Sequence, residues 1–213
     1  MSSVCIIFAP MNNCKDNAQY TWAENVIIVD GDYIDSVAFD MTVNFERIIG
    51  RRIPKADLAK WIDCVALDGG IRPGDNQTKV VFIHGRTHKE LENFTPGDYE
   101  DEICGKAFLD NLGEFELEAY PESDFADTDR FIAEIISIAC SEKQVKRIII
   151  VPNTESPELM GQLNHVLRNV DDEKRITLLT MSPKAGGNFR QEILGYSLMC
   201  ALGIKSDEIK TDD

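Results

Sequence analysis

The sequence lacks the features that would place the protein in a membrane or on an export route. In its 213 residues, no apolar run approaches the roughly 20 residues that a membrane-spanning helix needs. The apolar stretch Val4–Ala9 is too short for a signal peptide, and no basic residue precedes it. We therefore expect no association with a membrane.

Basic residues are scarce. The chain has 22 Lys and Arg against 37 Asp and Glu, which gives a formal net charge of −15. Proteins that bind duplex nucleic acid usually carry a basic footprint, because neutralising phosphates drives their affinity. The charge therefore argues against duplex binding. It leaves RNA open as a partner, because carboxylates bind Mg²⁺ and the metal can then bind phosphate.

Closely spaced cysteine pairs and several catalytic motifs are also missing. The sequence contains no C-x-x-C pair, no P-loop and no G-x-S-x-G turn. Scattered cysteines without such pairing are typical of a reducing compartment, so we expect six free thiols in a cytoplasmic protein. These six are Cys5, Cys14, Cys64, Cys104, Cys140 and Cys200.

The apolar residues present, 43% of the chain, fall into short runs that predict strands. Several of these runs do not alternate with polar residues, which is typical of parallel strands covered on both faces. In Phe115–Ala119 the apolar residues do alternate, so we expect that strand near an edge. The predicted strands are Val4–Ala9, Val26–Val29, Lys79–His84, Phe115–Ala119, Arg147–Val151 and Ile176–Met181.

Helical patterns lie between the strands, and the alternation predicts a fold class. We expect a three-layer α/β/α sandwich with a mostly parallel central sheet, Rossmann-like or PIN-like, over residues 1–204 and a frayed polar tail over 205–213. The predicted helices have apolar stripes at Ala38–Ile48, Leu58–Val65, Phe131–Ile138 and Leu159–Leu167, with Pro54 starting the second, and a last helix runs from Asn188 to Leu202. The role of residues 10–24 stays open.

Two helices carry further expectations. Glu134 lies in the run Phe-Ile-Ala-Glu-Ile-Ile, and such apolar neighbours predict a buried, paired carboxylate. The last helix, from Asn188 to Leu202, is apolar around much of its circumference. It either packs into the core or forms an interface in a homo-oligomer or with a protein partner.

Carboxylates follow the strands at the edge where parallel sheets bind ligands. Asp30 and Asp32 come directly after Val26–Val29, and an acidic stretch with Asp124, Asp127 and Asp129 follows Phe115–Ala119. Glu155 follows Arg147–Val151. If these side chains converge, Asp30, Asp127, Asp129 and Glu155 are the catalytic candidates. Asp30, Asp32, Asp127 and Asp129 are the candidate ligands of Mg²⁺ or Mn²⁺.

A structural role explains the same residues. Asp is a common turn residue and helix cap, so Asp127 is equally a cap candidate, and Glu155 directly precedes the Ser-Pro-Glu start of a helix.

The order of these acids resembles the NYN branch of the PIN-like nuclease superfamily. The likeness rests on VIIVDGDYI (26–34), DTDRFIAEIISIA (127–139) and IIIVPNTESPEL (148–159). It implies a metal-dependent RNA nuclease in which Asp30 is the primary metal ligand and Asp127 or Asp129 the middle one. The last motif departs from the family's Ser-Gly-Asp-x-Asp, because Asn153 and Glu155 stand where two Asp residues are expected.

Three functions therefore remain open. The first is a non-catalytic module that keeps the scaffold and acts through protein interactions. The second is an Mg²⁺- or Mn²⁺-dependent RNA phosphodiesterase with an acidic site at the carboxyl ends of the strands. A small-molecule or nucleotide enzyme that uses the loops after Ile83 and Ala119 is a third.

Overall fold

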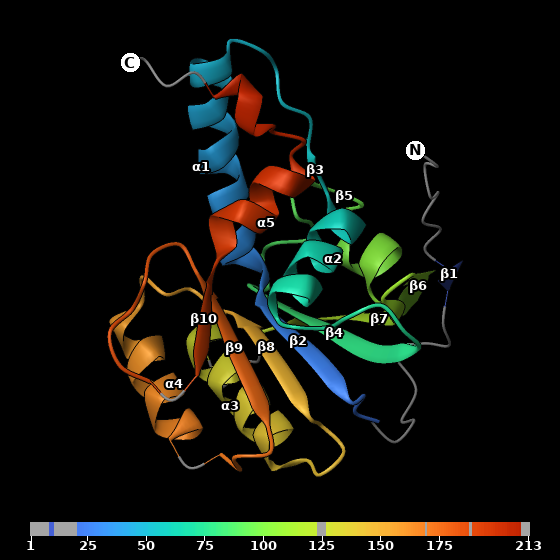
Figure 1. Ribbon diagram of the computed structural model, residues 1–213, viewed down its shortest axis with the longest axis vertical. Coiled ribbons are helices and arrows are strands. Elements are labelled where there is room, and N and C mark those ends of the chain that lie inside the picture. The colour runs from blue at the N-terminus through green and yellow to red at the C-terminus, as the bar shows by residue number, and fades with distance from the viewer. Residues whose placement is uncertain (1–8, 11–20, 123–126, 169, 188, 210–213) are drawn as a thin grey trace.

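One mixed sheet forms the centre of the protein, shown in the computed structural model of Figure 1. The structure describes residues 9–10, 21–122, 127–168, 170–187 and 189–209. Predictions for most of Val4–Ala9, for Cys5 and Cys14, for Asp124 and for Asn188 lie outside these residues. Within the described residues, eight strands pair in the order β1-β6-β7-β4-β2-β8-β9-β10. They are β1 Ala9–Pro10, β2 Asn25–Asp30, β4 Asn76–His84, β6 Lys106–Asp110, β7 Gly113–Pro121, β8 Arg147–Val151, β9 Arg175–Thr180 and β10 Arg190–Ile193.

Helices cover both faces of this sheet. The apolar residues of β2 alternate between two buried clusters, with Ile27 and Val29 in one and Val26 and Ile28 in the other. The first cluster includes side chains from α1, α2 and α5, and the second includes side chains from α3 and α4. The predicted three-layer α/β sandwich is therefore confirmed. The helices are α1 Gly31–Ile49, α2 Leu58–Asp68, α3 Thr128–Ser141, α4 Pro157–Leu167 and α5 Leu194–Ala201.

The parallel part of the sheet has the order of a doubly wound fold. Strands β7, β4, β2, β8, β9 and β10 pair parallel with one another. Numbered along the chain, their spatial order is 3-2-1-4-5-6, which is the order of Rossmann folds. The order reverses between β2 and β8, so the carboxyl ends of these two strands form the switch point where such folds bind ligands.

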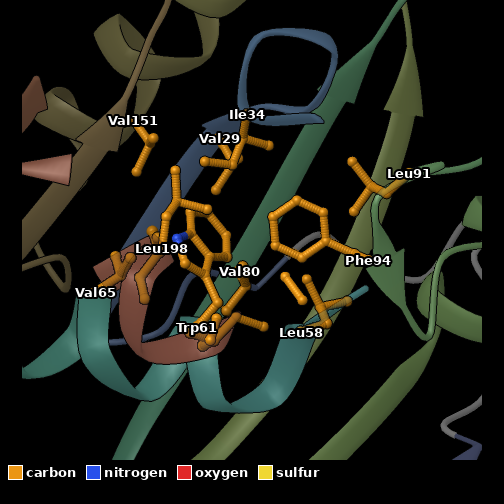
Figure 2. Close-up of a cluster of buried hydrophobic side chains, with 14 of the residues drawn as sticks. Val29, Ile34, Leu58, Trp61, Val65, Val80, Leu91, Phe94, Val151 and Leu198 are labelled. Carbon is orange, nitrogen blue, oxygen red and sulfur yellow. The ribbon is translucent and has the colours of Figure 1, made fainter. Parts of the chain in front are cut away.

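A large aromatic side chain fills the layer between this sheet and α2. Trp61 is fully buried, and its ring lies edge-on to that of Phe94, with centroids 5.7 Å apart. Figure 2 shows Trp61 and Leu58 from α2 facing Val29 and Val80 of the sheet, with Leu198 of α5 beside them. Phe94 belongs to β5 (Phe94–Thr95), which pairs with β3 (Ala56–Asp57) in a small second sheet. This cluster joins the second sheet to the main one.

The loop after β4 holds a short irregular helix, the π-helical turn η1 at Tyr99–Ile103. Asp98 caps it, because its carboxylate accepts hydrogen bonds from the backbone N–H groups of Glu100 and Asp101 at 2.9 and 2.7 Å.

Strand β7 lies near one edge of the sheet, as its alternating pattern predicted: among the described strands, β6 and the two-residue β1 lie outside it. The side chains on one face of β7 are buried and those on the other are half-exposed. The predicted start of the second helix was wrong. Helix α2 begins at Leu58 with Asp57 as its cap, so Pro54 lies before the helix rather than at its first turn.

The buried position predicted for Glu134 was also wrong. Its side chain is 53% exposed and pairs with Arg130 at 3.1 Å. Helix α3 buries Ile132 and Ile136 against the sheet and leaves Ile138 48% exposed on its outer side. The run of isoleucines is therefore broader than the face that the sheet covers.

The C-terminal segment differs from its prediction at both ends. Residues 190–193 form β10, so α5 begins at Leu194 and buries Leu194 and Leu198 in the core. The tail is not frayed up to Ile209. Residues Ser206–Glu208 form the 3₁₀ turn η2, and the Glu208 carboxylate binds the Arg51 guanidinium with N–O distances of 2.7 and 2.8 Å.

Cys104 contradicts the prediction of six free thiols, because it is disulfide-bonded. Cys64, Cys140 and Cys200 are free. Strand β1 pairs antiparallel with β6 and aligns Pro10 with Lys106, so a strand about 95 residues away in the sequence lies beside the segment that contains Cys104, a contact that the spacing of the cysteines does not reveal. The spacing of the cysteines therefore no longer supports a reducing compartment.

Candidate functional site at the switch point

Asp30 lies at the switch point, as the last residue of β2 and the cap of α1. Its Oδ1 accepts a hydrogen bond from the Tyr33 backbone N–H at 3.0 Å, and the residue is only 4% exposed. Burial raises the pKa of the Asp30 carboxyl to about 6, and the nearby charges of Asp32 and Asp129 add to the rise. A strand end that also starts a helix therefore holds a strongly desolvated carboxylate.

Asp32 joins the ends of β2 and β4. Its Oδ2 accepts from the backbone N–H of Gly85 at 2.7 Å, and its Oδ1 lies 2.7 Å from Nδ1 of His88. The loop after β4 is thereby fixed to the first turn of α1. Both carboxylate oxygens of Asp32 have a protein partner.

Tyr99 and His84 form the wall of the site on the β4 side. Their rings stack in parallel, with centroids 3.9 Å apart and planes 6° from parallel. A Cβ on Gly31 would lie 2.2 Å from the Tyr99 hydroxyl oxygen, so the Asp-Gly-Asp turn needs glycine at its centre to admit this ring. Burial lowers the pKa of His84, which disfavours an imidazolium beside the acids.

Asp129 and Asp127 begin α3 on the β8 side. Asp129 accepts a hydrogen bond from the Ser156 hydroxyl at 2.5 Å, and Ser156 in turn caps α4 by accepting from the Leu159 backbone N–H at 3.2 Å. Asp127 is exposed and caps α3, accepting from the Arg130 backbone N–H at 2.9 Å. The fold thus brings Asp129 close enough to influence Asp30 and gives Asp127 the role of a cap.

The last acidic position, Glu155, is exposed. Burial raises the pKa of the Tyr33 phenol, and the charge of Glu155 adds to this rise. Asn153 uses its side-chain oxygen to accept from the Glu155 backbone N–H at 3.0 Å.

These residues do not fit a metal as they are arranged. Asp32, Asp127 and Asp129 are engaged in internal hydrogen bonds, and the carboxylate of Asp30 caps α1. Within the described ranges, no group of three or more His, Cys, Asp or Glu side chains is placed to hold a metal ion.

Four residues of the site were not among the sequence candidates: Tyr33, Tyr99, His84 and Ser156. The signal for Ser156 was present in the Ser-Pro-Glu helix start, which marks a cap. Tyr99 lies 67 residues beyond Asp32 in a loop without periodicity, so no local pattern could have placed it. His84 was recognisable only as the end of a strand.

Together, the strand order and these side chains define a doubly wound α/β protein with a cluster of acidic side chains at its switch point. The chain belongs to a family of unknown function (DUF6621), whose model matches residues 19–209.

Two other comparisons gave no match: neither the curated proteins nor the solved structures contain a significant relative. No helix in the part of the chain that the structure describes could cross a lipid bilayer.

Proposed function

We propose that this protein is a non-catalytic α/β module, a degenerate relative of the NYN and PIN-like nucleases that acts by binding other molecules. One observation carries the proposal: the acids that match the nuclease pattern hold the protein's own backbone and helix ends. Asp30 and Asp127 cap helices, Asp32 holds the loop after β4, and Asp129 binds Ser156.

The absence of a charge at Asn153 supports the same proposal. A magnesium site needs several carboxylates, because the ion gives up its water reluctantly. The side-chain oxygen of Asn153 is neutral and already accepts a backbone hydrogen bond. Desolvation also opposes the ionisation of the Asp30 carboxyl, so this group attracts a cation only weakly.

Calorimetric titration with Mn²⁺, together with a cleavage assay on single-stranded RNA, tests this proposal. We expect no saturable Mn²⁺ binding below millimolar concentration and no metal-dependent cleavage. Asp30→Asn is the matched variant, because it keeps the size of the side chain and an oxygen for the Tyr33 N–H. Micromolar binding in the wild type that this variant abolishes, with RNA cleavage, would refute the non-catalytic proposal.

The second candidate is the Mg²⁺- or Mn²⁺-dependent RNA phosphodiesterase. The observation in its favour is that, besides burial, the charges of Asp32 and Asp129 raise the pKa of Asp30, and a bound cation would relieve this repulsion. The titration above separates the two candidates.

A protein partner that binds at the C-terminal helix would contact the exposed side chains of α5. Tyr196 is 71% exposed, whereas Leu194 and Leu198 of the same helix are fully buried. Exposed tyrosines are frequent anchors of interfaces. Light scattering of wild type, Tyr196→Ala and the equally exposed control Leu109→Ala tests this part of the proposal. We expect any self-association to weaken in the first variant alone, and equal behaviour of all three proteins would exclude Tyr196 as the anchor.

A further inference from the structure

Four arginines converge on one pocket at the amino end of the sheet, opposite the edge that bears Asp30. Arg147, Arg175 and Arg190 are the first residues of β8, β9 and β10, and Arg72 follows α2. The pocket has a volume of about 510 Å³. For a chain with a net charge of −15, such a concentration of guanidinium groups is not expected from composition.

The register of the sheet places three of these side chains on one face. Arg147 is aligned with Arg175, and Arg190 is aligned with Thr177, two residues beyond Arg175. Side chains two residues apart, or aligned in neighbouring strands, point to the same side of a sheet. That side is the one covered by α2, because Ile149, two residues beyond Arg147, packs into the cluster that contains Trp61.

The two glycines after α2 make room for this arrangement. A Cβ on Gly70 would lie 2.8 Å from Nη1 of Arg147, and one on Gly69 would lie 2.1 Å from Cδ1 of Ile149. Gly70 also has φ of +88°, which other residues rarely adopt. A backbone without side chains therefore brings the end of α2 directly against the guanidinium of Arg147.

Several of the arginines are held in place before any ligand arrives. Nη1 of Arg147 donates to the Gly69 carbonyl at 2.7 Å. Nη1 of Arg72 donates to the carbonyls of Leu67 and Ile71 at 2.8 and 2.9 Å. Arg190 pairs with Glu192 through an Nε–Oε1 contact of 2.7 Å. Fixed guanidinium groups lose little freedom when they bind an anion.

The pocket nevertheless retains unused positive charge. Among the described residues, Arg72, Arg147 and Arg175 form no ion pair with a carboxylate, and the buried Nε of Arg147 has no hydrogen-bond partner. Burial and the neighbouring charges of Arg175, Arg72 and Arg190 lower the pKa of Arg147. The opposing charges nearby are Glu24 beside Arg147, and Asp68 and Glu192 beside Arg190. An anion would relieve this repulsion and accept the free donor.

We propose that this arginine pocket binds the phosphate groups of a small phosphorylated molecule, with a diphosphate as the smallest suitable group. Guanidinium groups bind phosphate oxygens in pairs, so several converging arginines match a group with many charged oxygens better than a single carboxylate. The volume lies in the range of small-molecule sites. A long polyanion is disfavoured, because the remaining surface of the chain is strongly acidic.

Calorimetric titration with inorganic pyrophosphate, in the presence of EDTA, tests the proposal. We expect saturable binding with one site per chain and a rise of the melting temperature with pyrophosphate concentration. Arg175→Gln is the most informative variant, because within the described residues its side chain forms no hydrogen bond or ion pair that the substitution would break. It should weaken binding by about tenfold or more, the loss of one charge-assisted hydrogen bond.

The matched control is Arg47→Gln, which removes one exposed arginine in the last turn of α1 and should change the affinity less than about twofold, since an exposed charge outside the site contributes little. Arg147→Gln should abolish binding, and circular dichroism checks that this variant is folded. A parallel titration with ADP distinguishes a free diphosphate from a nucleotide as the source of the phosphates.

Three results would overturn the proposal: no saturable binding of pyrophosphate or ADP, an equal loss of affinity in Arg175→Gln and Arg47→Gln, or tighter binding of single-stranded RNA than of pyrophosphate. Asp30→Asn should leave pyrophosphate binding unchanged. The outcome is therefore independent of the experiment on Mn²⁺ and RNA cleavage.

Discussion

Ser156 donates its hydroxyl hydrogen to Asp129 at 2.5 Å while its Oγ accepts the Leu159 backbone N–H at 3.2 Å. The Ser156 side chain thus joins the first turns of α3 and α4 beside the switch point. A carboxylate in the first turn of a helix is also favoured by the helix dipole, so Asp129 is stabilised twice without a cation.

Ser156→Ala is expected to lower the free energy of unfolding by about 1–2 kcal/mol, because it removes a helix cap and the partner of a half-buried carboxylate. Urea denaturation measures the change. Ser36→Ala, at an exposed position in α1, is the control and should be neutral within about 0.5 kcal/mol. Equal stability of both variants would mean that the Ser156 contacts contribute nothing.

The raised pKa of Asp30 predicts a specific dependence of stability on pH. The folded protein holds the proton up to about pH 6, whereas the unfolded chain releases it near the ordinary value of 3.8. The free energy of unfolding therefore falls as the pH rises from about 3.8 to about 6. The loss is complete above this range, with an upper limit of about 3 kcal/mol.

Asp30→Asn should remove that loss. The variant is expected to be more stable than the wild type by about 1–3 kcal/mol at pH 7.5 and to lose this advantage at pH 3.5. Denaturation at both pH values measures the difference. An advantage that does not change with pH would show that Asp30 titrates normally.

Asp63 on α2 is a second carboxyl group whose ionisation the fold disfavours. Burial, together with the neighbouring Asp110 carboxylate, raises the pKa of Asp63 far above its ordinary value of 3.8. Asp63→Asn gives Asp110 an amide donor in place of a second acid, so we expect a higher melting temperature at pH 8 than in the wild type. Asp40→Asn, exposed on α1, controls for the change in net charge. A rise of equal size in both variants would assign the effect to net charge alone.

Trp61 is expected to contribute most to the core between α2 and the sheet. Trp61→Ala should cost about 3–5 kcal/mol, because a fully buried side chain leaves a cavity among Phe82, Phe94 and Leu198. Tyr196→Ala, which removes an exposed ring, should change stability by less than about 0.5 kcal/mol. Similar losses in the two variants, measured by denaturant unfolding, would contradict the arrangement in Figure 2.

The fold could be predicted because its signals are local. The continuous apolar runs of β2, β4 and β8 require cover on both faces, and the helices between them supply it. Alternation in β7 correctly placed this strand near an edge, because it reports that one face is less buried. Only the tertiary structure decides that β6 pairs antiparallel with β7 on its outer side.

The roles of the acidic side chains at the switch point could likewise be predicted only in part. Their places after the strands could be predicted, because a strand end is visible in the sequence. Whether a carboxylate faces a cation or a backbone N–H depends on loops that arrive from elsewhere, such as Gly85 for Asp32 and Ser156 for Asp129. For Glu134, the helix could be predicted from its apolar pattern, but how much of the helix circumference the sheet would cover could not.

The sequence by itself determined the alternation of strands and helices, the apolar core of the parallel strands and the acidic strand ends, because each follows from the residues within one segment. Only the tertiary structure decided the strand order, the disulfide at Cys104 and the meeting of Arg72, Arg147, Arg175 and Arg190. These arginines are up to 118 residues apart, and no local sequence pattern around them predicts that they meet. They form a pocket because parallel strands begin at the same edge of a sheet, a relationship that arises from pairing between distant segments.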